Sequence, residues 1–141
     1  SPEGCEYAIR GGDLFPRTMV VKVGQMVRLA NGDGTVHELA IEGVDDGTPL
    51  PTAPGNARQV TISAAGSHAV SDAIYAHVHG HIVAVPNLAA CGSVDDEGNF
   101  TFPSVDPGDY TLAVYRGGEQ VHEQNVSIGD GTTELPRIGL E

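Results

Sequence analysis

Apolar and polar residues alternate with a period of two along most of this chain, a pattern typical of half-buried β-strands. On Val36–Ile41, the alternation places His37, Leu39 and Ile41 on one face of a strand. Residues 42–57 are predicted as a long surface loop, and no segment keeps the helical period of about 3.6 residues. The same pattern predicts the remaining strands: Thr18–Val23, Met26–Ala30, Arg58–Ile62, Ser67–Val70, the second half of His77–Val85, Tyr110–Tyr115, Gln120–Ile128 and Leu135–Ile138.

Turn-forming residues separate these segments at short intervals. The chain has 19 Gly and 9 Pro among 141 residues. Turns are predicted at Asn31–Gly34, Gly117–Gly118 and Gly129–Gly131, because Gly and Asn accept positive φ. The length fits one domain with a core of its own. The sequence therefore predicts an all-β fold, a Greek-key β-sandwich, as a single domain over residues 1–141.

The net charge of the chain excludes some classes of function. Seven Lys and Arg stand against 19 Asp and Glu, for a formal net charge of −12. Such a surface repels a phosphate backbone, so nucleic-acid binding is not expected. The apolar runs are far shorter than the roughly 20 residues that a membrane span requires. The acidic surface, together with the opening Ser1–Cys5, which fits a processed terminus, favours a secreted, periplasmic or cell-surface location.

The two cysteines, Cys5 and Cys91, stand far apart in the sequence. In a chain of exported character they are predicted to form one disulfide that ties the N-terminal segment to the body of the domain. Closing a loop of that size stabilises a fold by up to about 4 kcal/mol in the chain-entropy treatment. The alternative is a pair of buried free thiols, and neither cysteine has a partner at the C-x-x-C spacing of redox and metal sites.

The stretch PRTMVVKVGQMVRLANGDGTVHELAI, Pro16–Ile41, resembles the opening of cupredoxin-like domains. In those domains a strand leads through a Gly-bearing turn to a second strand, and then to an Asn-containing turn and a histidine that binds copper. The resemblance implies a cupredoxin-like part over residues 1–88. It places His37 at the position of the first copper ligand.

A second stretch, SVDDEGNFTFPSVDPGDYTLAVYRGGEQVHEQNVSIGDGTTEL, Ser93–Leu135, resembles the carboxypeptidase regulatory-like, or transthyretin-like, β module. The similarity lies in Asp-x-x-Gly-x-Phe-x-Phe, followed by Pro-Gly-x-Tyr-x-Leu and a late strand. This resemblance implies an appended hairpin module over residues 89–141, with a structural or partner-binding role. Some bacterial periplasmic proteins join two such parts, and this chain is similar to them.

The region that corresponds to the copper-ligand loop of cupredoxins, Ser71–Val85, contains no Cys and no Met. A blue-copper site needs a thiolate sulfur, so electron transfer by such a site is excluded. Three histidines stand there instead, at alternate positions: His77, His79 and His81. Alternate residues of a strand share one face about 6.5–7 Å apart at Cα, close enough for two imidazoles to bind one ion.

We therefore expect a Cu(II) or Zn(II) site from His37, His77, His79 and His81, most simply two of the row plus His37 from a neighbouring strand. All three members of the row could reach one ion only if the chain bends, as Gly80 would permit. Two alternatives stay open. The row is a solvated ladder on the surface or packs with aromatic residues, or it binds metal between subunits at a symmetric interface.

Other motifs are assigned ordinary structural roles. His68 and His122 are isolated and are predicted to be surface or capped histidines. Glu38, Asp72 and Tyr75 are candidates for supporting contacts to a metal site or for an oxygen ligand, although no pattern singles them out. Asp95–Asn99 lacks the spacing of a calcium loop and is predicted as a hairpin turn. No nucleophile elbow, phosphate loop or HExxH motif is present, so an enzyme is not expected.

The function predicted from the sequence is that of an extracytoplasmic protein that binds Cu(II) or Zn(II) through a histidine cluster. The alternative is a structural or assembly module of a cell-surface or polymeric extracellular structure. In that case the histidines are incidental or bridge subunits through metal, and the partners are further copies of the chain in a homo-oligomer or polymer.

Overall fold

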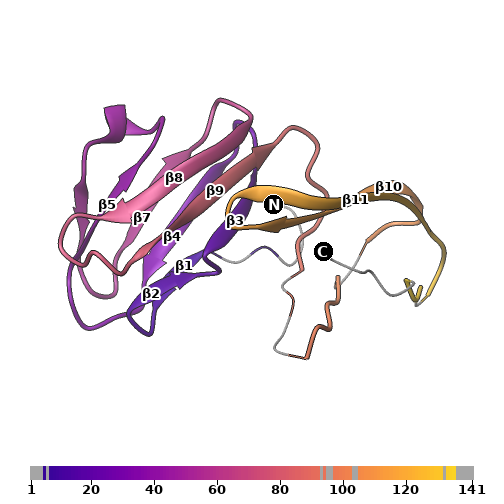
Figure 1. The fold of residues 1–141 in the computed structure, drawn as a ribbon, viewed down its shortest axis with the longest axis horizontal. Helices are drawn as coiled ribbons and strands as arrows, with labels where there is room; N and C mark the ends of the chain where they lie inside the picture. The colour runs from indigo at the N-terminus through magenta and orange to yellow at the C-terminus, as the bar shows by residue number, and fades with distance from the viewer. Residues whose placement is uncertain are drawn as a thin grey trace.

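The computed structural model describes residues 5, 7–92, 94, 97–102, 105–131 and 133–135. Within these ranges the regular structure is β apart from one short 3₁₀ turn, η1 (Asp45–Gly47). Figure 1 shows a sandwich of two sheets and a long β-hairpin that projects from it. None of the described segments forms a helix long and apolar enough to cross a membrane.

The sandwich has two mixed sheets. The first is four-stranded, in the order β2-β1-β4-β7, and the second is five-stranded, in the order β3-β9-β8-β5-β6. Each sheet is mixed because β1 pairs in parallel with β4, and β3 pairs in parallel with β9. The first sheet consists of β1 (Ala8–Arg10), β2 (Asp13–Phe15), β4 (Met26–Asn31) and β7 (Ala57–Thr61). The second consists of β3 (Thr18–Lys22), β5 (His37–Ile41), β6 (Leu50–Thr52), β8 (Gly66–Asp72) and β9 (His79–Val85).

The core lies between the two sheets and takes alternate residues from their strands. It includes Leu29 of the first sheet and Leu39 and Ile41 of the second, all of them fully buried. Burying a side chain of this kind stabilises the fold by about 1.5–3 kcal/mol. The face predicted for Val36–Ile41 is therefore the core face, and His37 belongs to it with only 2% of its surface exposed.

The all-β class is confirmed, and most predicted strands occur within a few residues of their expected ends. Strands β1 and β2 were not predicted, because strands of 3 residues are too short for an alternation to be recognised. Strand β6 was not predicted either; it is an edge strand that carries Pro51 inside the predicted loop 42–57. Leu135 lies outside any strand, and the rest of the predicted last strand is outside the described residues.

The projecting hairpin consists of β10 (Gly108–Arg116) and β11 (Glu119–Ile128), joined by Gly117–Gly118. Both glycines have positive φ, +61° and +80°, as the predicted turn requires. Gly118 is buried, and a Cβ there would lie 2.5 Å from Cγ of His81 and 2.7 Å from Oγ of Ser67. The turn of the hairpin therefore packs on the outer face of β8 and β9, and Figure 1 shows the rest of the hairpin extending away from the sandwich.

A disulfide joins Cys5 to Cys91 across 86 positions, as the sequence analysis predicted. Cys5 precedes β1, and Cys91 lies between β9 and the hairpin. The bond therefore attaches the N-terminal segment to the point where the chain leaves the sandwich. It closes a long loop, which restricts the unfolded chain more than the folded one.

Strands β3 and β9 come into close contact at Gly80. The carbonyl oxygen of Arg17 accepts a hydrogen bond of 2.8 Å from the backbone N–H of His81. A Cβ on Gly80 would collide with that same oxygen. A glycine is therefore required where the end of one strand meets the other, which is a different role from the bend considered in the sequence analysis.

We predict that Gly80→Ala lowers the free energy of unfolding by about 1–3 kcal/mol, because the added methyl group displaces backbone in a packed region. Urea unfolding followed by circular dichroism measures the change. Gly129→Ala is the matched control, since a Cβ at that position meets nothing within 4 Å. Equal stability of the two variants would contradict the close approach of β3 and β9.

Candidate functional site

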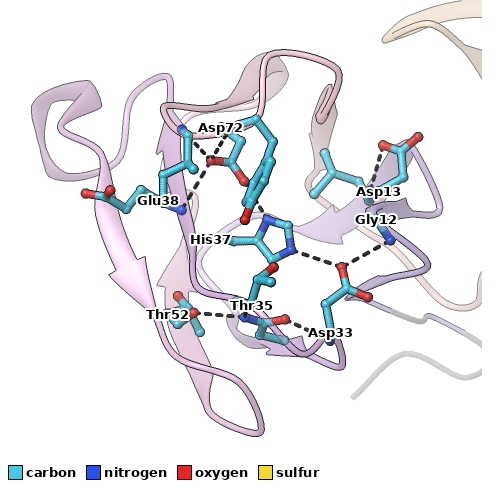
Figure 2. A network of polar contacts seen from close by, with 12 residues as sticks. Gly12, Asp13, Asp33, Thr35, His37, Glu38, Thr52 and Asp72 are labelled. Carbon is cyan, nitrogen blue, oxygen red and sulfur yellow. Dashed lines mark hydrogen bonds and ion pairs between the residues drawn. The ribbon is translucent and has the colours of Figure 1, made fainter.

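His37 lies in the interior between two carboxylates (Figure 2). Its Nδ1 is 2.6 Å from Oδ2 of Asp72, and its Nε2 is 2.9 Å from Oδ2 of Asp33. An imidazole donates hydrogen bonds from both nitrogens only when it carries both protons. The geometry therefore fits a buried imidazolium held by two counterions, with neither ring nitrogen available to another ligand.

Asp33 is positioned by the predicted turn that follows β4. The side-chain amide of Asn31 donates to the carbonyl oxygens of Thr35 and Thr52, at 2.8 and 2.9 Å. The amide oxygen of Asn31 accepts the backbone N–H of Asp33 at 2.9 Å. Asn side chains form such local bonds readily, which is why they favour turns. A buried asparagine thus holds the carboxylate of Asp33 in place for His37.

Asp72 ends β8, and its side chain is completely buried. Burial raises the pKa of Asp72, but hydrogen bonds from His37 and from the backbone N–H groups of Ile74, Tyr75 and Glu38 outweigh it. The net result is a pKa below the ordinary value of an aspartate. Asp72 is therefore an ionised counterion of His37 at neutral pH.

His77 contacts the margin of this network. The ring of Tyr75 lies between two histidines, with its centroid 5.3 Å from that of His37 and 6.1 Å from that of His77. Nε2 of His77 is 2.9 Å from the carbonyl oxygen of Gly12, whose N–H donates to Asp33 at 3.1 Å. The network therefore joins the loop after β8 to the turn between β1 and β2.

His79 and His81 lie on the outer face of β9, away from the network around His37. Along β9, Gly80, Ile82 and Ala84 are buried, so the alternate residues His79 and His81 face away from the core. Both histidines line a cavity of about 550 Å³ between the outer face of β3 and β9 and the hairpin. Neither ring nitrogen of either residue has a hydrogen-bond partner in the part of the chain that the structure describes.

The four predicted ligands therefore do not form one cluster. Strand β8 separates β5 from β9, so the expectation that His37 comes from a strand next to the histidine row is wrong. His37 also faces the core, whereas His79 and His81 face outward. Among the described residues, no three His, Cys, Asp or Glu side chains are placed to hold a metal ion. A two-residue period specifies the face of a strand, but it does not specify which strands are neighbours.

The remaining residues from the sequence analysis have ordinary roles where they are described. Each ring nitrogen of His68 lies within 3.0 Å of a backbone carbonyl oxygen, which agrees with a capped histidine. Nε2 of His122 is 2.7 Å from the side-chain oxygen of Gln124 on the hairpin. In the turn considered for calcium, Asp95 and Asp96 lie outside the described residues.

Sequence reasoning missed three residues of these two sites. It did not pair Asp33 with His37, although the two stand at i and i+4 across a turn, which is the signal that could have linked them. It also missed Arg17 and Arg116, which line the cavity beside the histidines. No local signal connects these arginines, because one precedes β3 and the other ends β10.

Solved structures similar to this chain include several of amicyanin. Amicyanin from Paracoccus versutus matches with a TM-score of 0.50 and 15% identity, over 60% of this chain and 85% of that chain. The structure of a reduced tryptophan-to-tyrosine variant of amicyanin matches with a TM-score of 0.50 and 20% identity, over 60% of this chain and 86% of that chain. The Cu(I) form of a methionine-to-alanine variant of amicyanin matches with a TM-score of 0.50 and 19% identity, over 60% of this chain and 85% of that chain. This chain has a cupredoxin-like fold.

Residues 91–135 match the family described as polysaccharide lyase family 4, domain II. This is the part of the chain that resembles a carboxypeptidase regulatory-like module, and the comparisons give no support to that resemblance. No curated protein matches the sequence. The cupredoxin-like fold is therefore the firm result of the comparisons.

The residues present do not fit the blue-copper site that a cupredoxin-like fold implies. His37 stands at the expected position of the first ligand, but each of its ring nitrogens already contacts a carboxylate. Cys5 and Cys91 are joined to each other, which leaves no thiolate. Met19 is buried in the core, and Met26 is 62% exposed on the other sheet. In place of copper ligation, the chain has an ion-pair network around His37.

We predict that Asp72→Asn lowers the free energy of unfolding by about 3 kcal/mol, because it removes one counterion from a buried charge. Urea unfolding at pH 7 measures the change. Asp46→Asn is the control: this exposed aspartate is in η1, outside the network, and its replacement should change stability by less than about 0.5 kcal/mol. Equal effects of the two substitutions would contradict a buried ion pair at His37.

The lowered pKa of Asp72 also predicts a dependence on pH. The native pKa lies below the unfolded value of about 3.9, so the carboxylate stabilises the fold above that pH. This contribution is lost as the pH falls through the native pKa. The difference in unfolding free energy between wild type and Asp72→Asn should therefore be constant above about pH 5 and shrink at lower pH. A difference that persists or grows down to about pH 2 would argue against this assignment.

Proposed function

We propose that this protein binds Cu(II) or Zn(II) outside the cytoplasm through His79 and His81, as a binding protein and not as an electron carrier or enzyme. One observation carries the proposal. The two imidazoles stand on the same outward face of β9, line the same cavity, and have no hydrogen-bond partner in the described ranges. Imidazole is the commonest protein ligand of both metals.

The spacing of the pair suits a shared ion. Residues two apart on a strand have Cα atoms about 6.5–7 Å apart, and their side chains project in the same direction. A metal bound by two imidazoles keeps open positions for water or for an added ligand. Such a site would bind and release its ion more readily than a closed four-ligand site.

The other two histidines of the predicted set serve the fold instead. His37 would have to leave both Asp33 and Asp72 before it could bind a metal ion, and it is buried. His77 has Nε2 on the carbonyl oxygen of Gly12, on the edge of the network around His37. The metal site that we propose is therefore smaller than the one expected from the sequence.

An extracytoplasmic location is supported by the disulfide between Cys5 and Cys91, because such bonds persist in oxidising compartments. The net charge of −12 is consistent with a protein that meets cations at its surface. The location and the binding role together correspond to storage, delivery or sensing of a metal ion.

Metal titration of protein made without a His-tag tests the proposal. We expect about one equivalent of Cu(II) or Zn(II) per chain by calorimetry, and loss of this binding in His79→Ala and in His81→Ala, because each substitution removes one of two ligands. His77→Ala and His122→Ala are matched controls that should bind like wild type. No stoichiometric binding, or equal loss in the controls, would overturn the His79–His81 site.

The same protein samples, with and without metal, also test the alternative that the chain is an assembly module. Strand β11 pairs with β10 alone in the described part of the chain, so each strand of the hairpin has an unpaired edge. Unpaired edges can recruit further strands. If metal joins subunits instead of occupying one chain, size-exclusion chromatography will show a larger species with metal that chelator converts to monomer.

A further inference from the structure

The charged side chains that line the cavity beside β9 are arginines, although the protein as a whole is acidic. The chain has 7 Lys and Arg against 19 Asp and Glu. The described residues that line the cavity nevertheless include two arginines and two histidines and no Asp or Glu. A concave surface lined by one sign of charge concentrates ligands of the opposite sign. This local reversal of charge points to an anion.

Cationic groups reach the cavity from both of its walls. Arg17 lies just before β3 and bonds to Asp13 through Nε, at 2.8 Å, and through one terminal nitrogen. Its other terminal nitrogen makes no hydrogen bond or ion pair within the described part. Arg116 ends β10 on the opposite wall and has no ion pair with any residue that the structure describes. A planar guanidinium binds a carboxylate with two parallel hydrogen bonds, which suits Arg116 to an anionic ligand.

The rest of the lining is apolar and aromatic. Phe100 and Phe102 lie edge to face with ring centroids 6.0 Å apart, and both line the cavity with Tyr7. The hydroxyl of Tyr7 donates to the carbonyl oxygen of Val20 at 2.7 Å, and burial raises the pKa of Tyr7 to about 12. Tyr7 therefore adds no negative charge at neutral pH. Flat apolar side chains favour a ligand with a ring.

We propose that this cavity binds a small organic carboxylate that carries a ring, with Arg116 as the principal partner of the carboxylate. The ring lies against the aromatic wall, and Arg17, His79 and His81 supply further donors. The cavity of about 550 Å³ is large enough for such a molecule. The inference does not depend on the metal proposal, because the arginines bind the anion whether or not the imidazoles hold an ion.

Calorimetry in the presence of a chelator tests the inference with two probes of the same shape, 2-naphthoate and 2-naphthamide. We expect the carboxylate to bind at least tenfold more tightly than the neutral amide. We also expect Arg116→Gln to weaken naphthoate binding by roughly tenfold or more, the effect of losing a hydrogen bond to a charged group, and to leave naphthamide unaffected. Arg28→Gln, on an exposed position of β4 in the other sheet, is the matched control and should bind as wild type does.

A second pair, galacturonate and galactose, distinguishes an acidic sugar from an aromatic acid as the source of the carboxylate. Preference for either acid over its neutral partner, lost in Arg116→Gln, supports the inference. Binding of neither acid at millimolar concentration, or equal loss in Arg28→Gln, would overturn it. Because the chelator removes metal, failure of the His79–His81 site leaves this result unchanged, and the two proposals fail separately.

Discussion

A buried histidine ring held between two carboxylates is the constraint on which much of this structure depends. Burying polar groups costs free energy unless they are hydrogen-bonded, and Asp33 and Asp72 each contact one ring nitrogen of His37 in the core. The two carboxylates must in turn be held in place by their own surroundings. Asp33 needs the turn held by Asn31, and Asp72 needs the backbone N–H groups of the loop after β8. The contacts of one buried ring thereby link loops from both sheets.

The cupredoxin-like fold is thus used here in an unusual way. The position at which the resemblance expects a copper ligand is filled by an internal network of charges, while the exposed histidines stand on the outer face of the same sheet. The turn of the β10–β11 hairpin packs against His81 on that face, and a cavity lies beside it along β9.

Much of the fold could be predicted from the sequence. Alternation located most strands and the core face of β5, and two distant cysteines were correctly paired. The candidate site was harder to predict than the fold, because His37 and His79 each stand in a segment of alternating apolar and polar residues. The burial patterns place their rings on opposite faces of the sheet, and the strand order, with β8 between β5 and β9, shows that the two strands are not neighbours. Strand order arises from long-range packing and turn geometry, which short patterns do not encode. The cavity arginines were missed for the same reason.

The disulfide has a consequence beyond stability. Cys91 itself lines the cavity, so the bond to Cys5 fixes one part of the wall while Gly118 against His81 fixes another. A thiol reductant would cut the first attachment and leave the second intact. The N-terminal segment would then no longer be tied to the cavity wall at Cys91, while the contact of Gly118 with His81 would remain.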